Sequence, residues 1–421
     1  MHVTETAARV PGGSRGRTQL GPALALIHGG RAPTRAALGA GLGVSRATAG
    51  AVAAELQALR LIRVDNAPGG GTLGRPSHRL TIDPDGPVAL AAQVHPDGFQ
   101  VALVGLGGRV VATAGRTALR PDDDPERALA PVVKTGARLL RRTGRACVGA
   151  GLAVPSAVAE PEGVAVSPLY LGWPTGAPVR DIFSDQVDRA GITGPGGGSC
   201  ACSAANDINL AALAEHRHGA GRDADHLLVV ATGHRGVGGA LVLGGALYTG
   251  STGLGMEVGH VSIDPQGRPC RCGSRGCLDV ETDALSFLDA AGRLPRPGVP
   301  VIEQATALLR GQYSADAAVR AAASAVIERL GPGLADLINV LNPDRILLGG
   351  LHADLLAADP GKLGAIVAER SPWGRGSSVP VLACALEAGS LIGAAELAWQ
   401  PLLDDPAAIL DAQLTRAGLR S

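Results

Sequence analysis

The sequence lacks any long uninterrupted hydrophobic run, although 46% of its 421 residues are hydrophobic. A membrane-spanning helix needs about 18 or more consecutive apolar residues, so the sequence predicts no transmembrane segment and no membrane partner. Residues 1–18 also lack the apolar stretch and small-residue cleavage site of a secretory signal. We expect residues 1–18 to be a disordered leader of a cytoplasmic protein.

Net charge is absent as well, since 38 basic residues balance 38 acidic ones. The balance hides an asymmetry, because residues 1–80 contain ten arginines and three acidic residues, a formal charge of +7, while the rest of the chain carries −7. Contacts to phosphate are built from Lys and Arg, so this division favours a polyanion partner for the first 80 residues only. A solvated basic tail is the alternative that charge alone leaves open.

The cysteines do not have the number or spacing of a disulfide framework. There are seven, and three of them fall within eight residues, which argues for a metal site in a reducing compartment. His260, Cys270, Cys272 and Cys277 supply one imidazole and three thiolates, a closed tetrahedral set typical of structural zinc. Three free cysteines in a glycine-rich loop are the alternative, but that spacing has no packing rationale. We predict zinc at these four residues.

A chain of this length should divide into two or three folding units, and residues 19–85 form the first. Apolar residues at helical spacing predict a helix over residues 21–29. Thr34 is placed to cap a short helix over residues 35–40, and Ser45 to cap a third helix that runs to about residue 59. A short helix, a tight turn and a longer helix are the order of a helix-turn-helix.

Two predicted strands, residues 61–64 and 79–82, then flank a tip that contains Gly74-Arg75-Pro76, as in the wing of a winged helix-turn-helix. An extended Arg at such a tip suits the minor groove of DNA. The first turns of the third helix should project Ser45, Arg46, Thr48 and Ala49. An ordinary helical bundle with a glycine hairpin is the alternative. We predict contacts to double-stranded DNA from Arg35, Ser45, Arg46, Thr48 and Arg75.

Residues 83–87 break both periodicities, and we place a domain boundary there. Beyond it the chain alternates apolar strands with helices in two successive rounds, which predicts an α/β protein of two lobes with a cleft between them. We expect lobe one over about residues 86–205 together with the C-terminal helix, and lobe two over about residues 206–388. Predicted strands are 88–94, 99–104, 109–113, 148–154, 226–231, 240–243 and 345–348, and predicted helices are 207–216 and 317–341, the latter broken near 331–333.

Four motifs make this chain resemble the ROK family of repressors, open reading frames and kinases. They are the residues 206–212, Glu257-Val258-Gly259-His260, the cysteine run through Asp279, and residues 341–350. The resemblance implies an N-terminal winged helix-turn-helix followed by a two-lobed actin-like ATPase (ribonuclease H-like) domain of sugar-kinase type. It also implies sugar contacts from Asn206, Asp207, Glu257, His260 and Asp279, a dense polar set that suits a polyhydroxylated ligand.

The residue that matches Asp207 is the general base of the family's kinases. On spacing alone, a helix cap would explain Asn206-Asp207 equally well. Asp279 stands where the family usually has Glu, and Pro155-Ser156 replaces the usual Pro-Gly. The segment 167–170 lies where the family often supplies further sugar contacts.

The two phosphate loops of the family's kinases are degraded here. Residues 93–98 read Gln-Val-His-Pro-Asp-Gly in place of Asp-x-Gly-Gly-Thr-Lys, so the metal-binding Asp is missing, Pro96 removes an amide donor, and Asp97 sets a carboxylate against phosphate. In the second loop, residues 234–239, the usual threonine is missing but the glycine turn remains. We therefore expect neither ATP binding nor phosphotransfer.

These observations predict a DNA-binding transcriptional regulator whose operator affinity responds to a sugar or sugar-phosphate effector. The resemblance implies that it is a repressor and a homodimer or higher homo-oligomer. A sugar kinase that uses Asp207 as its base is the first alternative. The second is a DNA-binding protein without a small-molecule ligand, in which Glu257 and Asp279 only orient the zinc ligands.

Overall fold

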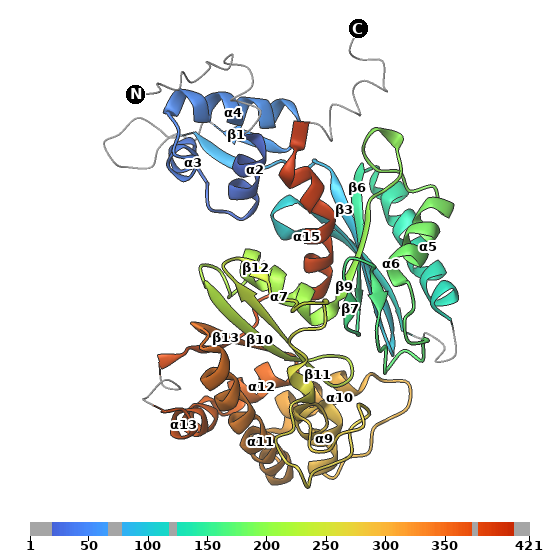
Figure 1. Cartoon of the computed structure of the whole chain (residues 1–421), viewed down its shortest axis with the longest axis vertical. Helices are drawn as coiled ribbons and strands as arrows, with labels where there is room; N and C mark the ends of the chain where they lie inside the picture. Colours follow the sequence, from blue (N-terminus) through green and yellow to red (C-terminus); the bar gives the residue numbers. More distant parts are fainter. Residues whose placement is uncertain (1–18, 66–77, 118–123, 373–377, 408–421) are drawn as a thin grey trace, which may run out of the picture.

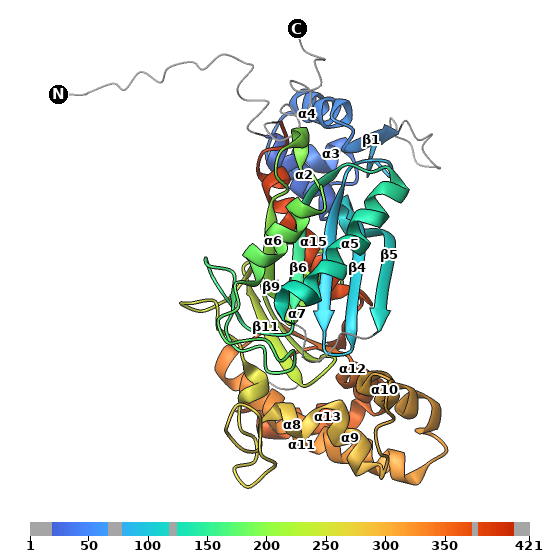
Figure 2. The same cartoon turned by 90° about the vertical axis from the view of Figure 1, so that its right-hand side faces the viewer.

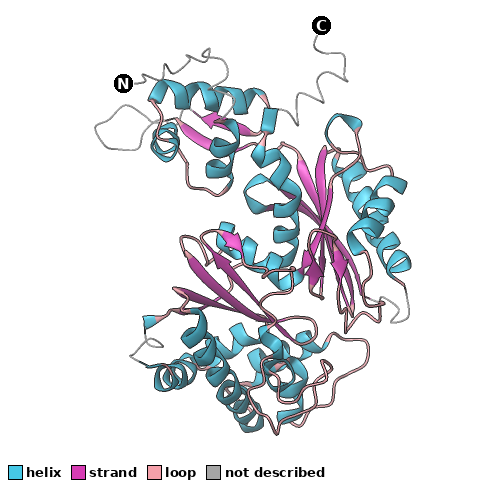
Figure 3. Cartoon of the chain, viewed as in Figure 1, coloured by secondary structure: helices cyan, strands magenta, loops and turns pink. Residues whose placement is uncertain are grey.

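A computed structural model describes residues 19–65, 78–117, 124–372 and 378–407 of the chain. Three bodies follow one another along its long axis (Figure 1). An N-terminal body of short helices lies at one end, and two α/β lobes, each with one main sheet, make up the rest (Figure 3). Within the described residues, no helix has the length and apolar content that crossing a membrane requires.

The N-terminal body consists of α2 (Leu20–His28), α3 (Arg35–Leu42), α4 (Arg46–Ala58) and the antiparallel strands β1 (Ile62–Asp65) and β2 (Arg79–Ile82). The Thr34 hydroxyl accepts a hydrogen bond from Ala37 N at 3.1 Å, and the Ser45 hydroxyl accepts one from Thr48 N at 3.2 Å. Both caps are those that the sequence predicted. The predicted wing tip, with Arg75, lies outside the described residues.

One residue of the predicted DNA-facing set is turned inward. Ser45 and Arg46 are exposed and Thr48 is half-buried, but Ala49 is fully buried, and its methyl group lies beside Gly39 of α3. The expectation for Ala49 was wrong because α3 approaches α4 at this turn, which leaves space only for a small apolar side chain.

Lobe one is built on the sheet β5-β4-β3-β6-β9. Its strands are β3 (Val88–His95), β4 (Gly98–Gly105), β5 (Arg109–Thr117), β6 (Cys147–Val154) and β9 (Cys202–Asn206), of which β3, β6 and β9 are parallel. Alternate residues of β3 face opposite layers. Val88 and Leu90 pack with helices α5 (Pro125–Thr143) and α6 (Val179–Arg189), whereas Ala89 and Ala91 belong to the cluster of α15 (Gly389–Asp404). Figure 2 shows α5 in front of this sheet.

Lobe two has the sheet β12-β11-β10-β13-β14. Its strands are β10 (His226–Thr232), β11 (Val237–Leu243), β12 (Ala246–Leu247), β13 (Arg345–Gly349) and β14 (Val381–Ala383). One face packs on α7 (Asp207–His218), and the other packs on a group of helices. That group is α8 (Leu278–Thr282), α9 (Ala284–Ala290), α10 (Val301–Gln312), α11 (Ala317–Leu341), α12 (Leu351–Ala358) and α13 (Pro360–Arg370). Smaller elements are β7 (Val158–Ala159), β8 (Val164–Ala165) and short 3₁₀ turns at 106–108, 195–197 and 258–260.

Helix α11 corrects one expectation, because it runs unbroken from Ala317 to Leu341 with Pro332 inside it. The flanking glycines are there for packing. A Cβ on Gly331 would lie 2.5 Å from the Ile366 side chain of α13, and one on Gly333 would lie 3.0 Å from Leu278 of α8. The Gly-Pro-Gly sequence lets two helices approach closely, and tertiary packing outweighs the local tendency of proline to break a helix.

Helices α7 and α15 form the layer between the two sheets (Figure 1). A Cβ on Gly393 of α15 would lie 1.9 Å from Leu210 O of α7, and one on Gly151 of β6 would lie 2.0 Å from Ala394 O of α15. Glycine is therefore required at both positions, and α15 is held directly against α7 on one side and the lobe-one sheet on the other.

A buried carboxylate joins these two helices to the N-terminal body. Glu396 of α15 is fully buried and contacts the Nε2 atoms of His28 at 2.9 Å and His218 at 2.8 Å, and Arg217 Nη1 at 2.6 Å. Gly107 N donates to His28 Nδ1 at 2.9 Å, so Nε2 is the nitrogen that donates to Glu396. Burial alone would raise the pKa of Glu396, but the neighbouring His28 and the hydrogen bonds from His218 and His28 hold it well below its ordinary value.

We expect Glu396→Gln to lower the free energy of unfolding by about 3 kcal/mol at pH 7, because it leaves the buried face of a cationic Arg without its anion. The folded-state pKa of Glu396 is depressed, so its stabilisation is present above the unfolded value of about 4.3 and is lost as the pH falls further. The difference between wild type and variant, measured by urea denaturation, should thus shrink below about pH 4.

Glu328→Gln is the matched control, since Glu328 pairs with Lys362 on the surface with its side chain 60% exposed. It should change the free energy of unfolding by less than about 1 kcal/mol. Equal effects of the two substitutions would contradict a structural role for Glu396.

Candidate functional site

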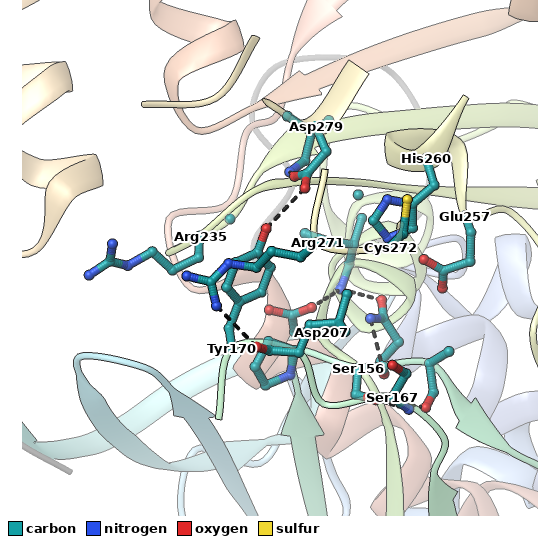
Figure 4. Close-up of a pocket in the computed structure, with 18 of the residues that line it drawn as sticks. Ser156, Ser167, Tyr170, Asp207, Arg235, Glu257, His260, Arg271, Cys272 and Asp279 are labelled. Atoms are coloured by element: carbon teal, nitrogen blue, oxygen red, sulfur yellow. Dashed lines mark hydrogen bonds between the residues drawn. The ribbon is translucent and has the colours of Figure 1, made fainter. Parts of the chain in front are cut away.

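A cavity of about 450 Å³ lies between the two lobes. Figure 4 shows the polar side chains that converge on it. Lobe one contributes Ser156, Ser167, Tyr170 and Asn206, and lobe two contributes Asp207, Arg235, Glu257, His260 and Asp279. The five residues predicted as sugar contacts therefore line one cavity, although they come from three separate segments of the chain.

Asn206 and Asp207 sit where β9 passes into α7. Asn206 Oδ1 accepts hydrogen bonds from Ile208 N and Asn209 N at 2.9 and 3.0 Å, so Asn206 is the N-cap of α7, and its Nδ2 donates to Ser156 O at 3.2 Å. Asp207 is only 6% exposed. Burial raises its pKa to about 6, against the opposing effects of His234 and of a backbone hydrogen bond from Ile208. Asn206 therefore caps α7, as the alternative interpretation of the sequence allowed, and this start of the helix places Asn206 and Asp207 on the cavity wall.

Glu257 and His260 flank the short 3₁₀ turn Val258–His260. The Glu257 side chain is open to the cleft, and no hydrogen bond within the described residues engages its carboxylate. Partial desolvation by the cavity walls raises its pKa, while the adjacent His260 acts in the opposite direction. His260 Nδ1 points to the cysteine cluster, 3.7 Å from Cys270 Sγ. One imidazole can therefore serve the metal cluster through Nδ1 and face the cavity with its other edge.

Asp279, at the start of α8, is the most heavily engaged of the five. Its Oδ1 accepts from Val237 N at 2.6 Å, and its Oδ2 accepts from the Tyr170 hydroxyl at 2.9 Å. A Cβ on Gly236, which has φ +73°, would lie 2.2 Å from Oδ1, so the glycine turn of the second phosphate loop is needed for this contact. The Cys270 thiol also lies 3.9 Å from Oδ2. Asp279 thus ties together the loop, the cysteine cluster and lobe one.

From the sequence, Tyr170 was named only as part of the segment 167–170, and its contact with Asp279 was not foreseen. Tyr170 belongs to lobe one, and its hydroxyl crosses the cleft to Asp279 of lobe two, while Arg271 lies over its ring with the guanidinium carbon 5.1 Å from the centroid. Arg271 also donates to Leu169 O at 3.4 Å. These contacts hold the segment 167–171 against the cysteine loop and close one end of the cavity. No local signal points to a pairing between residues 109 positions apart.

The cysteine loop brings together the four predicted metal ligands. One ligand atom from each of His260, Cys270, Cys272 and Cys277 lies within 4.8 Å of all the others. The Sγ atoms of Cys272 and Cys277 are 3.7 Å apart, which is also the distance from Cys270 Sγ to His260 Nδ1. Two ligand atoms on one tetrahedral ion with bonds of about 2.0–2.3 Å lie about 3.3–3.8 Å apart. The cluster could therefore hold a metal ion.

The two degraded phosphate loops face each other beside the cavity. His95 and Asp97 lie at the β3–β4 turn, and His234 and Arg235 lie at the β10–β11 turn. The rings of His95 and His234 stack with their centroids 3.6 Å apart, and Asp97 contacts His234 Nδ1 at 3.7 Å and Arg235 at 3.5 Å. Side chains occupy the space between the two turns, a contact that the sequence analysis did not foresee.

The predicted DNA contacts lie apart from the cavity, in the N-terminal body. Ser45, Arg46 and Thr48 are grouped at the start of α4, and Arg35 is the first residue of α3, with its Nε buried and without a hydrogen-bond partner among the described residues. Arg75 falls outside the described residues.

Comparison with known proteins identifies relatives of two kinds. The family description "ROK family" matches residues 96–400. A glucokinase of Halalkalibacterium halodurans is 30% identical over 218 residues, which cover 48% of this chain and 61% of that protein. The DNA-binding transcriptional dual regulator NagC of Escherichia coli K12 is 30% identical over 219 residues, covering 48% of this chain and 51% of NagC. The chain thus matches about half to three fifths of the length of these relatives.

Solved structures support the fold. A ROK family transcriptional regulator, described as a homolog of the E. coli MLC protein, aligns with a TM-score of 0.72 over 95% of this chain and 99% of its own, at 20% identity. A ROK family glucokinase from Streptomyces griseus, solved with glucose and AMPPNP, aligns with a TM-score of 0.60 over 74% of this chain and 99% of its own, also at 20% identity. The predicted actin-like two-lobed fold is confirmed, and the N-terminal helices fit a winged helix-turn-helix.

We expect Tyr170→Phe to lower the free energy of unfolding by about 1.5 kcal/mol, because it removes a hydrogen bond to a charged acceptor but keeps the ring under Arg271. Tyr248→Phe is the matched control, since Tyr248 is 48% exposed, and it should have an effect below about 0.5 kcal/mol in the same urea titration. An unchanged midpoint for Tyr170→Phe would rule out a contribution of the cross-lobe contact to stability.

Proposed function

This chain belongs to the ROK family, and from that premise we propose that it is a transcriptional repressor that binds operator DNA through its N-terminal body and a sugar or sugar phosphate between its lobes. Its relatives include both repressors and glucokinases, so the family alone does not select between regulation and catalysis. The observation that carries the proposal is the course of helix α7, which begins at the cavity and ends at the N-terminal body.

Helix α7 connects two places that a kinase has no need to connect. Its first residue is Asp207, and the N-cap before it is Asn206, both on the cavity wall. At its other end, Arg217 and His218 contact Glu396, which in turn contacts His28 of α2. A ligand that displaces the start of α7 therefore acts on the support of the DNA-binding module. Such a ligand changes operator affinity only if it prefers one of the two arrangements.

The cavity wall supports a sugar as the ligand. Glu257 has a free carboxylate, Asp207 is a buried carboxyl group, and Asn206 Nδ2 is a donor with a second hydrogen, so the wall offers both acceptors and donors to neighbouring hydroxyl groups. A site built to pair hydroxyl groups discriminates strongly against ligands that lack them. Asp279 contributes more to positioning than to direct contact, because both its oxygens already accept hydrogen bonds.

The degraded phosphate loops weigh against the kinase alternative. In place of amide donors and a free metal-binding carboxylate, the two turns hold stacked imidazoles and an Asp that is engaged by His234 and Arg235. Asp207 keeps the position of a general base, which is the one observation in favour of catalysis. Formation of ADP from ATP and magnesium in the presence of a hexose would revive that alternative.

The cysteine cluster is proposed as a structural zinc site, with His260 Nδ1 and the thiolates of Cys270, Cys272 and Cys277 as ligands. This donor set fits zinc by its chemistry and by the separations of its atoms. Bound zinc would supply cross-linking and no reactive position, because all four ligand places would be filled by protein. The cysteine loop would then hold Arg271 in place, and Arg271 contacts the ring of Tyr170 at the edge of the cavity.

The DNA-binding module is proposed to act as a homodimer on a two-fold symmetric operator, with the start of α4 in the major groove. Arg35, Ser45, Arg46 and Thr48 are the proposed contacts among the described residues, and Arg75 would enter the adjacent minor groove. The formal charge of +7 over residues 1–80 supports this assignment.

The first test is a thermal-shift panel of sugars, sugar phosphates and ATP with magnesium. We expect one sugar or sugar phosphate to raise the melting temperature and ATP to leave it unchanged. Glu257→Gln should weaken binding of that ligand about tenfold, because one hydrogen bond to a charged acceptor contributes about 1.5 kcal/mol. It should leave the unliganded melting temperature unchanged, since Glu257 makes no hydrogen bond within the described residues. Glu328→Gln is the control, and equal affinities for the two variants would remove the cavity from the proposal.

Arg46→Ala should weaken operator binding by about 1–3 kcal/mol, roughly 5- to 150-fold, in fluorescence anisotropy at fixed salt. Arg141→Ala is the matched control, because Arg141 is an exposed arginine of α5 in lobe one and its loss changes the net charge equally. If both substitutions weakened binding alike, the effect would be one of net charge, and α4 would not be the recognition helix.

A further inference from the structure

Two turns from different lobes place three potential metal ligands together beside the cavity. His95 and Asp97 come from the β3–β4 turn of lobe one, and His234 comes from the β10–β11 turn of lobe two. One ligand atom from each residue lies within 4.8 Å of the other two. This group is separate from the cysteine cluster and shares no residue with it.

The three side chains share a second property, which is that each has a buried polar atom without a hydrogen bond. His95 Nδ1, Asp97 Oδ2 and His234 Nδ1 make none among the described residues, although Asp97 Oδ2 and His234 Nδ1 face each other as an ion pair 3.7 Å apart. His95 as a whole is only 4% exposed, and a buried polar atom without a hydrogen bond is unfavourable, so a ligand that bonds to all three atoms would satisfy them. The two rings stack face to face with 8° between their planes, so their in-plane lone pairs run parallel, and one ring must turn about its side-chain bond before both nitrogens point at one ion.

We propose that His95, Asp97 and His234 form a binding site for a divalent transition-metal ion such as Zn²⁺, which joins the two lobes at the turns that phosphate loops occupy in the family's kinases. Two imidazoles and one carboxylate are a donor set that zinc and its first-row neighbours accept, with a further position for water. Magnesium prefers oxygen ligands, so this set selects against it.

The surroundings allow such a site with a small adjustment. Tetrahedral ligands at about 2.0–2.2 Å from an ion lie about 3.3–3.6 Å apart, so atoms spread over as much as 4.8 Å must draw together by about 1 Å. Arg235 contacts Asp97 at 3.5 Å and must swing outward, and its side chain is already 33% exposed.

The consequence is a cross-link between lobes that does not depend on ATP. With the ion bound, the lobes are fixed beside the Tyr170–Asp279 contact, since Pro96 and Arg235 of the two turns line one hollow together with Tyr170. Removal of the ion leaves only the Asp97 contacts and the ring stack across this edge. The site stands on these contacts alone and does not depend on the proposed repressor function.

The test loads the full-length chain with Co²⁺ after removal of metals by a chelator. Thiolate ligands give intense sulfur-to-cobalt charge-transfer absorption, whereas two imidazoles and a carboxylate give only weak ligand-field bands. We expect wild type to bind one equivalent more than Asp97→Asn or His234→Gln, with the charge-transfer band unchanged by either substitution. Each substitution should weaken binding of that additional ion by at least about 100-fold, because loss of a residue that only hydrogen-bonds to a metal ligand already lowers metal affinity by about 10–100-fold.

His226→Gln, at an exposed histidine of β10, is the matched control and should bind as much Co²⁺ as wild type. Cys277→Ser should abolish the charge-transfer band but keep the ion at the lobe junction, which separates the two sites. Equal Co²⁺ content in wild type and Asp97→Asn would overturn the proposal. The proposal would also be overturned if the wild-type protein bound Co²⁺ only at the thiolate site, with no further equivalent beyond the one that gives charge-transfer absorption. A far-ultraviolet circular dichroism spectrum of each variant verifies that it is folded.

Discussion

The buried Glu396 carboxylate is the contact on which the arrangement of the three bodies depends. Its side-chain partners are His28 of the N-terminal body and Arg217 and His218 at the end of α7. Glu396 itself belongs to α15, which packs on β3 and β6 of lobe one. An uncompensated charge at this depth would be strongly unfavourable, so the histidines and Arg217 have to be present together. The apolar core continues across the same junction, because Leu20 and Leu24 of α2 share a cluster with Trp399 and Leu402 of α15. The N-terminal body is thus packed against α15 and the end of α7 through a continuous apolar core.

Local chemistry in the sequence was sufficient for much of the fold. The caps at Thr34 and Ser45, the seven predicted strands of the two lobes and the glycine turn at Gly236 each depend on a few adjacent residues, and the structure contains them. The short strands β9, β12 and β14 were not predicted. The predictions were wrong where packing against a segment distant in sequence determines the local structure. Ala49 is buried by α3, and α11 continues through Pro332 because α8 and α13 pack against it. Neither neighbour is visible within a window of sequence.

The same division holds for the candidate site. The cysteine cluster is nearly continuous in sequence, so its spacing alone predicted that these side chains meet. The placement of Asn206, Glu257 and Asp279 around one cavity came from resemblance to a family and not from physics, and their roles in binding stay predictions. The bond between Tyr170 and Asp279, and the stack of His95 on His234, depend on how two lobes close on each other. No periodicity or motif encodes that closure.

The length of α7 has a geometric consequence. Its 12 residues span about 18 Å, so a tilt of about 5° about its first turn would carry its far end through about 1.5 Å. Shifts of about 1–2 Å between packed helices separate the functional states of other switching proteins. Because Gly393 lets α15 lie directly on α7, the two helices would turn as one lever. A ligand that tilted α7 at the cavity would therefore displace the N-terminal body, which packs on the other end of α7 and on α15.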